Sequence, residues 1–282
     1  MKTLMKQILT SAAWLGLAAT AYPQTPGTDH VTVPFSDPSR PGSVKVSIIA
    51  GSISVKGYAG KEVVVDAKAR DEAEGRGRGR RERPETAGMK RIPNMSTGLS
   101  IEEEGNRVSI GASPTDRPID ITIQVPTHTG LDLKTINDGD ITVEQVQGEI
   151  EVNDINGAVT ITNVSGSVIA HALNGNVKVG LTGIEANKPM SFSSLNGDID
   201  VSFPADLKAN VSMKSDNGEI YSDFDVKIDN SAVQTTPEAS RSKGGKYRIK
   251  IDRTVKGTIN GGGPEMQFKT FNGNIYIRRS TK

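Results

Sequence analysis

Residues 137–179 read NDGDITVEQVQGEIEVNDINGAVTITNVSGSVIAHALNGNVKV. Within this stretch a glycine returns every nine residues, at Gly139, Gly148, Gly157, Gly166 and Gly175. A fixed period of this kind is typical of stacked supersecondary units. Stacked β units form elongated scaffolds with long exposed faces, on which binding is commoner than catalysis.

Apolar residues occupy the positions two, four and seven after each glycine. They are Ile141, Val143 and Val146; Ile150, Val152 and Ile155; Val159, Ile161 and Val164; and Val168, Ala170 and Leu173. The two-residue step puts two side chains on one face of a strand. The three-residue step breaks this alternation and predicts a bend, where Asn153-Asp154 and Thr162-Asn163 offer turn-forming residues.

Two architectures are compatible with the repeat. In an antiparallel meander, each Asn-Gly or Ser-Gly would form a tight hairpin turn, but the plus-seven residue would then point away from the other two. In a β-solenoid, corners after plus four and at Asn-Gly let all three apolar residues point inward. The pattern favours the solenoid and predicts Val146, Ile155 and Val164 in its interior.

The same spacing recurs outside the regular block. Leu131, Leu133 and Ile136 precede Gly139; Met190, Phe192 and Leu195 precede Gly197; Met266, Phe268 and Phe271 precede Gly273. A weaker copy before Gly218 has Val211 and Met213 but carries Asp216 at the third position. Two nine-residue halves predict one coil of roughly 18–22 residues, within the range of solenoid repeats.

The repeated glycines are interpreted as structural turns, and no cofactor is expected at them. Glycine accepts a positive φ at a corner, and a preceding asparagine tolerates a left-handed conformation. Asn137, Asn156, Asn174 and Asn196 would then stack and share side-chain hydrogen bonds. Calcium-binding nonapeptide repeats also have this period, but they need a G-G-x-G-x-D phrase in every unit, which is missing here.

The first 21 residues resemble a signal peptide. Lys2 and Lys6 precede a short apolar stretch, and Ala19-Thr20-Ala21 supplies small residues for cleavage. This stretch is too short for a convincing membrane span, so we expect no membrane span after signal cleavage, and an uncleaved anchor is the alternative. The exported chain, periplasmic or at the cell surface, contains no cysteine, so its stability would come from stacking.

Residues 22–130 are interpreted as an irregular N-terminal β region, and residues 131–282 as the repeat solenoid. Expected strands in the first region are 43–49, 52–55, 62–67, 99–102, 107–110 and 119–125. Two polar insertions interrupt the pattern, at 70–98 and 230–245. The first is rich in arginine and glycine and poor in apolar residues, which is typical of disorder.

Several phrases together resemble the bacterial putative-adhesin family of exported β-solenoid proteins, a domain of unknown function. They are GSISVKGYAGKEVVVDA, LSIEEEGNRVSI, IDITIQVPTHTGLDLKTINDGDITVEQVQGEIEVNDINGAVTI and the closing FNGNIYIRR. The resemblance spans residues 43–282 and implies a right-handed β-solenoid at a surface or periplasmic location. It implies no catalytic residues.

Residues able to carry chemistry are scattered. The three histidines, His30, His128 and His171, are far apart, and His171 is expected at a solvated corner. Zinc is not expected without cysteine or an H-x-x-H spacing. A polysaccharide lyase on a β-helix is the enzyme alternative, with Glu149, Glu151, Asp154 and Asp140 as candidates. Alternating outward acids, however, are also what solubility requires.

Charge offers one candidate contact. The net charge is +1, from 34 basic and 33 acidic residues, which gives no bulk attraction to nucleic acid. A local tract could contact an anionic polymer; its members are Arg76, Arg78, Arg80, Arg81 and Arg83. The sequence therefore predicts an exported, non-enzymatic β-solenoid that binds an envelope or surface protein or glycan. A purely structural envelope protein is the alternative.

Overall fold

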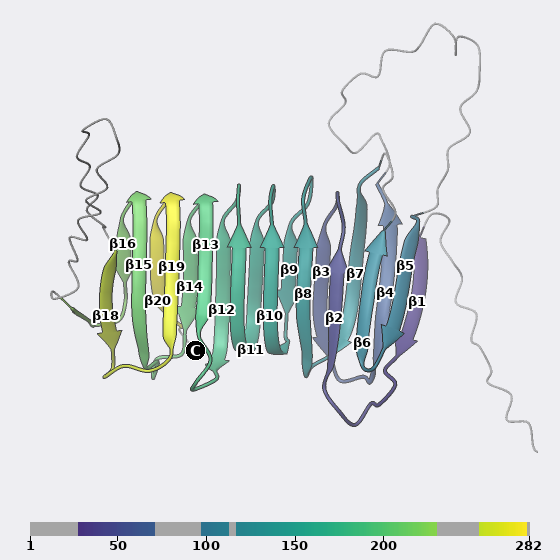
Figure 1. Ribbon diagram of the computed structural model, residues 1–282, viewed down its shortest axis with the longest axis horizontal. Coiled ribbons are helices and arrows are strands. Elements are labelled where there is room, and N and C mark those ends of the chain that lie inside the picture. The colour runs from purple at the N-terminus through teal and green to yellow at the C-terminus, as the bar shows by residue number, and fades with distance from the viewer. Residues whose placement is uncertain (1–27, 71–96, 113–116, 230–253, 281–282) are drawn as a thin grey trace, which may run out of the picture.

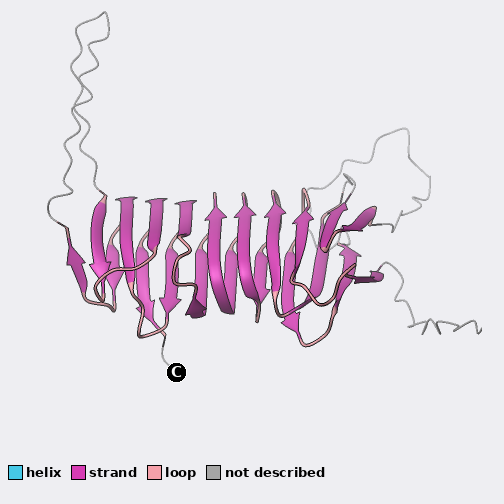
Figure 2. Ribbon diagram, turned by 60° about the horizontal axis from the view of Figure 1, so that its bottom comes forward, coloured by secondary structure: helices cyan, strands magenta, loops and turns pink. Residues whose placement is uncertain are grey.

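A computed structural model describes residues 28–70, 97–112, 117–229 and 254–280. The signal peptide, the arginine tract and the insertion 230–245 therefore lie outside the described residues. The described part is all β and solenoid-like: twenty strands form one elongated stack, in two rows that lie one behind the other (Figures 1 and 2). We call the rows the first and second sheet, and one level of the stack a rung.

The first sheet runs along the whole stack. Its strands, in spatial order, are β5 (Leu99–Glu104), β6 (Arg107–Ala112), β2 (Gly42–Ser47), β8 (Thr129–Thr135), β10 (Gln147–Asp154), the second half of β11 (Val159–Ala172), β13 (Met190–Asn196), β19 (Glu265–Asn272), β15 (Ala209–Asn217) and β18 (Val255–Ile259). The short β17 (Val226–Ile228) pairs with β18.

The second sheet lies opposite the first. Its strands, in spatial order, are β1 (Thr28–Pro34), β4 (Glu62–Ala69), β7 (Ile119–Pro126), β3 (Ile53–Tyr58), β9 (Ile141–Glu144), the first half of β11, β12 (Val177–Ile184), β14 (Ile199–Phe203), β20 (Ile275–Arg279) and β16 (Ile220–Ser222). All six strands expected before residue 126 are present, each within a few residues of its predicted bounds.

Parallel pairing excludes the hairpin meander. Ile150 lies opposite Val168 in register, Leu131 opposite Ile150, and Val177 opposite Ile199. These offsets of 18, 19 and 22 residues bring equivalent positions of successive repeats side by side. Parallel neighbours cannot be joined by a two-residue hairpin, so each repeat must pass through the opposite sheet before it returns.

The core fills the space between the sheets. Valine and isoleucine suit it because β-branched side chains pack well on a pleated surface. Near one end, Phe192 of the first sheet meets Phe203 of the second edge-on at 6.3 Å between ring centroids. Phe192 also stacks on Phe268 of the next strand, at 5.2 Å. The aromatic core therefore joins both sheets.

The order of the rungs does not follow the chain. Strands β19 and β20, near the C-terminus, insert between β13 and β15 and between β14 and β16; Figure 1 shows β19 in yellow between two green strands. At the other end, β2 and β3 insert between later strands in the same way. Strands from both sides of residue 130 therefore share one stack.

Antiparallel strands close the two ends. At one end β5 pairs with β6, while β4 pairs with both β7 and β1. At the other end β18 pairs with β15 and β17. Unpaired strand edges invite association with other chains, and the final antiparallel strands cover most of the parallel edges.

The prediction that every plus-seven residue is interior is half wrong. Val146 and Val164 are fully buried, but Ile155 and Leu173 are 39% and 42% exposed. The reason is the preceding residue: Asp154 and Ala172 continue their strands, so the next side chain points outward. Asn153-Asp154 therefore lies in β10 rather than in a turn. The residues three positions after each glycine are divided between the sheets, with Thr142 beside Thr160 in the second and Glu151 beside Ile169 in the first.

Candidate functional site

Two corners join the sheets, and glycine has a different role in them from the one predicted. The first corner holds the Asp-Gly turn of Gly139 and the Asn-Gly turns of Gly157, Gly175, Gly197, Gly273 and Gly218. The second holds Gly148 and Gly166, which lie within β10 and β11. Of these eight, only Gly166 and Gly273 adopt a positive φ. At Gly175, a Cβ would lie 2.0 Å from the carbonyl oxygen of Gly157. The first corner needs glycine because successive rungs approach closely.

A ladder of asparagines runs along the first corner, as predicted. Asn156 Nδ2 donates to Asn137 Oδ1 (3.0 Å), Asn174 to Asn156 (2.9 Å) and Asn196 to Asn174 (2.8 Å). Asn272 and Asn217 extend it by two further bonds of 2.7 and 2.9 Å. The rungs between Asn137 and Asn217 are thereby tied to one another by side chains as well as by backbone.

The plus-one oxygens at the first corner are also occupied. Asp140 Oδ1 accepts from the Ala158 N–H at 2.8 Å, and Asn176 Oδ1 accepts from the Asp198 N–H at 2.8 Å. These oxygens serve the backbone of the next rung. Among the described residues no group of three or more His, Cys, Asp or Glu side chains could hold a metal ion.

A row of small polar residues lies inside the first corner. Thr135 donates to the Gly51 carbonyl at 3.0 Å, Ser194 to Gly175 at 2.9 Å and Thr270 to Gly197 at 3.0 Å. Each hydroxyl thus satisfies a backbone carbonyl of the neighbouring rung.

Asp154 is the exception in this row. It is 3% exposed, and its carboxyl oxygens make no hydrogen bond within the described part of the chain. Burial, and then the nearby charge of Asp140, raise the pKa of Asp154 to about 7, against the opposing effect of the Asn156 N–H. A protonated carboxyl could donate to the Gly139 carbonyl, as its neighbours do, since Oδ2 and this oxygen both lie near Gly157.

The three histidines are not brought together. His30 lies on β1 and contacts Asp66 Oδ1 at 2.6 Å, and His128 is exposed between β7 and β8. His171 lies within β11 beside the Ser193 hydroxyl, so the expected solvated corner position is wrong. Burial holds the pKa of His171 below its usual value, although Glu151 opposes this.

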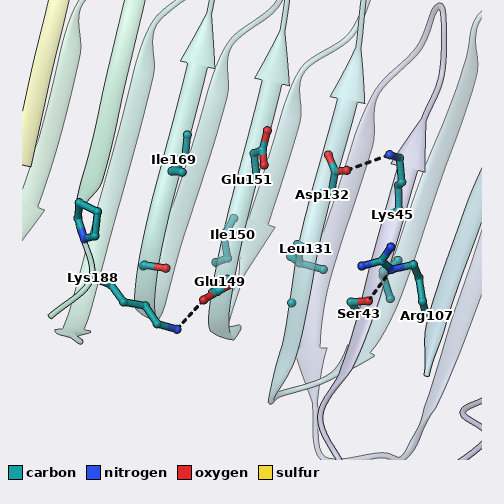
Figure 3. A pocket seen from close by; sticks show the side chains of 14 residues that line it. Ser43, Lys45, Arg107, Leu131, Asp132, Glu149, Ile150, Glu151, Ile169 and Lys188 are labelled. Carbon is teal, nitrogen blue, oxygen red and sulfur yellow. Dashed lines mark hydrogen bonds and ion pairs between the residues drawn. The ribbon is translucent and has the colours of Figure 1, made fainter. Parts of the chain in front are cut away.

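A shallow groove of about 570 Å³ crosses the outer face of the first sheet (Figure 3). Its floor is low where small residues, such as Ser43, Gly130 and Ser167, face outward from β2, β8 and β11. Lys188 and Pro189, from the connection between β12 and β13, form one wall. Ile169 gives this end an exposed apolar surface.

Charged side chains of both signs line the groove. Lys45 Nζ lies 3.2 Å from Asp132 Oδ2, and Lys188 Nζ lies 2.6 Å from Glu149 Oε1 and 3.0 Å from Glu185 Oε2. Hydrogen bonds to Glu149, and then to Glu185, raise the pKa of Lys188. Arg107 reaches the Ser43 hydroxyl at 3.5 Å, which is a weak bond.

The four acids considered for lyase chemistry separate in the structure. Glu149 and Glu151 line the groove, Asp140 bonds to backbone at the first corner, and Asp154 is buried. The basic groove residues Lys45, Arg107 and Lys188 were not predicted. Their only signal in the sequence is the alternation of polar and apolar residues, and this alternation is the same for every outward-facing side chain.

The fold and the groove together define an all-β scaffold of the solenoid-like class, with long exposed faces and a shallow polar hollow. The chain belongs to the Toastrack DUF4097 family, whose model matches residues 98–260, and this confirms the resemblance read from the sequence. The family name denotes a domain of unknown function. No curated protein matches the chain.

Two solved structures are similar to it. One is a putative cell adhesion protein from Clostridium sporogenes ATCC 15579, at 9% identity, covering 90% of this chain and 100% of that one with a TM-score of 0.42. The other is a putative adhesin from Bacteroides fragilis NCTC 9343, at 12% identity, covering 90% of this chain and 97% of that one with a TM-score of 0.35.

Proposed function

We propose that the protein is an exported, non-enzymatic scaffold of the adhesin type that binds a protein or glycan of the cell envelope or surface. The groove on the first sheet carries this proposal. It is shallow and open along several rungs, and it offers cations and anions within one hollow. Such a surface suits an extended polar partner held by many weak contacts.

The chemistry of the groove supports binding over catalysis. A lyase needs a side chain that accepts a proton from its substrate, and a lysine whose pKa is raised is poorly suited to this task. Asp154 has the pKa of a general acid or base, but it is buried inside the first corner, where a polymer cannot reach it.

A pull-down from the native envelope fraction tests the proposal. The bait is the mature chain, residues 22–282, compared with a Lys45→Glu/Arg107→Glu variant. Lys178→Glu, on the outer face of the second sheet, is the matched control. We expect the first variant to lose the bound component and the control to retain it. Equal capture by the wild type and both variants would show that the groove is not the binding surface.

The alternative is a purely structural role without a specific ligand. It predicts that none of the three baits captures an envelope component above background. Binding through the groove should also weaken with salt, because exposed charges are screened over about 8 Å at physiological ionic strength.

We also propose cleavage of the first 21 residues, supported by the pattern of Lys2, Lys6 and Ala19-Thr20-Ala21. Mass spectrometry of the exported protein should find Tyr22 at or near its N-terminus. Among the described residues, no helix has the length and apolar character needed to cross a membrane.

The proposal also includes the length of the half-coils and the handedness of the solenoid. We propose that the coils are built from paired half-coils, of nine residues each in the regular block, and wind right-handed. Successive parallel strands joined through the opposite sheet are the observation behind it, since crossovers between parallel strands are right-handed in nearly all known folds.

A further inference from the structure

Six large apolar side chains form one continuous row on the outside of the first corner. They are Ile49, Ile136, Ile155, Leu173, Leu195 and Phe271, and each is 39–48% exposed. We call this row the apolar ridge. It is independent of the groove, whose lining includes none of the six.

Pairing along the stack makes the six residues direct neighbours. The residues just before Ile155 and Leu173 face each other, as do those before Leu173 and Leu195. Backbone bonds agree: the Asn137 N–H donates to the Ile49 carbonyl, and the Asn196 N–H donates to that of Leu173, both at 2.9 Å. The row ends at Asp216, which takes the next position beside Phe271.

The residues beside the ridge are polar but uncharged at its centre. Asn156, Asn174 and Asn196 follow it on one side, while Asn153, His171 and Ser193 precede it on the other. Because the pKa of His171 is lowered, this flank is neutral at physiological pH. Depletion of charge around an apolar centre is typical of protein interfaces.

The exposed area is larger than isolated surface residues would give. With roughly 150–200 Å² on each large apolar residue, these exposures leave on the order of 450 Å² on the ridge, within the range of the largest patches on monomeric proteins. Two ridges would bury roughly 900 Å², and their flanks would bring the total to the ~1,000 Å² that a specific interface needs.

We propose that the apolar ridge is a self-association surface, on which a second copy of this chain docks ridge to ridge. The rungs repeat at the strand spacing of about 4.8 Å. A second copy has the same spacing and can interdigitate with all six side chains, whereas an unrelated partner would match few of them. The small area makes the dimer weak, with a dissociation constant in the micromolar range.

Sedimentation of the mature chain between about 1 µM and 500 µM tests this proposal. We expect the mass to rise from monomer to dimer, and Leu173→Glu/Leu195→Glu to weaken association at least tenfold. Ile228→Glu is the matched control, since Ile228 is 56% exposed on β17, away from the ridge. Leu173→Asn/Leu195→Asn removes apolar surface without adding charge, and thermal midpoints verify that each variant folds.

Cross-linking gives a second readout. The chain has no cysteine, so Leu173→Cys supplies a single thiol near the middle of the ridge, close to its counterpart in either orientation of the partner. A short bis-maleimide should link this variant faster than Ile228→Cys. The proposal is overturned by a wild-type monomer at all concentrations, by a dimer that the ridge variants leave intact, or by equal cross-linking.

Discussion

The first and second corners are built from the same nine-residue phrase, yet the apolar side chain seven positions after the glycine is buried at one corner and exposed at the other. At the second corner Val146 and Val164 are buried, while at the first corner Ile155 and Leu173 lie on the surface. The preceding residue makes the difference. Gln145 and Asn163 adopt left-handed φ values of 58° and 55°, whereas Asp154 and Ala172 stay in regular strand.

A single left-handed residue shifts the phase of the alternation. After it, the next side chain points into the core; without it, strict alternation sends that side chain outward. The register shift around Val164 is the visible sign of this change. Equal spacing of apolar residues along a chain therefore does not imply equal burial.

The largest expected effect separates the two corners directly. Val164→Asp would bury an unpaired carboxylate and should lower the free energy of unfolding by about 4 kcal/mol or more. Ile155→Asp, at the equivalent exposed position, should cost less than about 1 kcal/mol. Urea unfolding curves measure both. Similar losses for the two variants would contradict the assignment of the corners.

The second effect depends on pH. The pKa of Asp154 is raised to about 7 from 3.8. The folded protein therefore binds this proton more tightly than the unfolded chain does, and protonation of Asp154 stabilises the folded state. The associated stability is fully present below about pH 4 and is lost as pH rises towards 7. Between pH 5 and 8 the loss should be about 2–3 kcal/mol, at roughly 1.36 kcal/mol per pH unit.

The matched variant for this effect is Asp154→Thr, which copies Thr135 of the neighbouring rung. Its hydroxyl can donate to the Gly139 carbonyl at every pH. The difference in unfolding free energy between the variant and the wild type should therefore grow from pH 5 to 8, and other carboxylates cancel in that difference. A constant difference would show that Asp154 does not titrate near neutrality.

The third effect tests the close approach of rungs at the first corner. Gly175→Ala places a Cβ against the Gly157 backbone, and relieving this clash should cost about 2 kcal/mol. Gly111→Ala is the control, because its Cβ would meet no atom within 4 Å. Chemical denaturation should show no loss, or a slight gain, for the control. Equal behaviour of the two variants would refute the close approach.

The smallest effect concerns the asparagine ladder. Asn174→Ala removes its bonds to Asn156 and Asn196, which should cost about 1 kcal/mol because both bonds are exposed. Asn153→Ala removes only a bond to Glu151 of the same strand, at 3.2 Å, and should cost less. Thermal unfolding of the two variants measures these losses. Equal midpoints would show that the ladder does not contribute to joining the rungs.

The sequence alone predicted the features that depend on local residue patterns. Nine-residue spacing, alternating valine and isoleucine, and Asn-Gly turns predicted the all-β stack, the asparagine ladder and the strands before residue 126. The stack and the asparagine ladder depend on contacts between equivalent positions of a repeat, so the spacing alone predicts them, whereas the strands before residue 126 follow from their local residue pattern. The family resemblance added the class of the protein and no site.

Three features were decided only by the tertiary structure. The order of the rungs was hidden because the phrases around Phe192, Phe268 and Met213 are interchangeable, and only packing in the core places β19 between β13 and β15. The groove was hidden because its lining residues, such as Lys45, Glu149 and Lys188, come from several rungs. The apolar ridge was hidden because the backbone angle of one preceding residue, which composition does not reveal, sets the direction of each side chain.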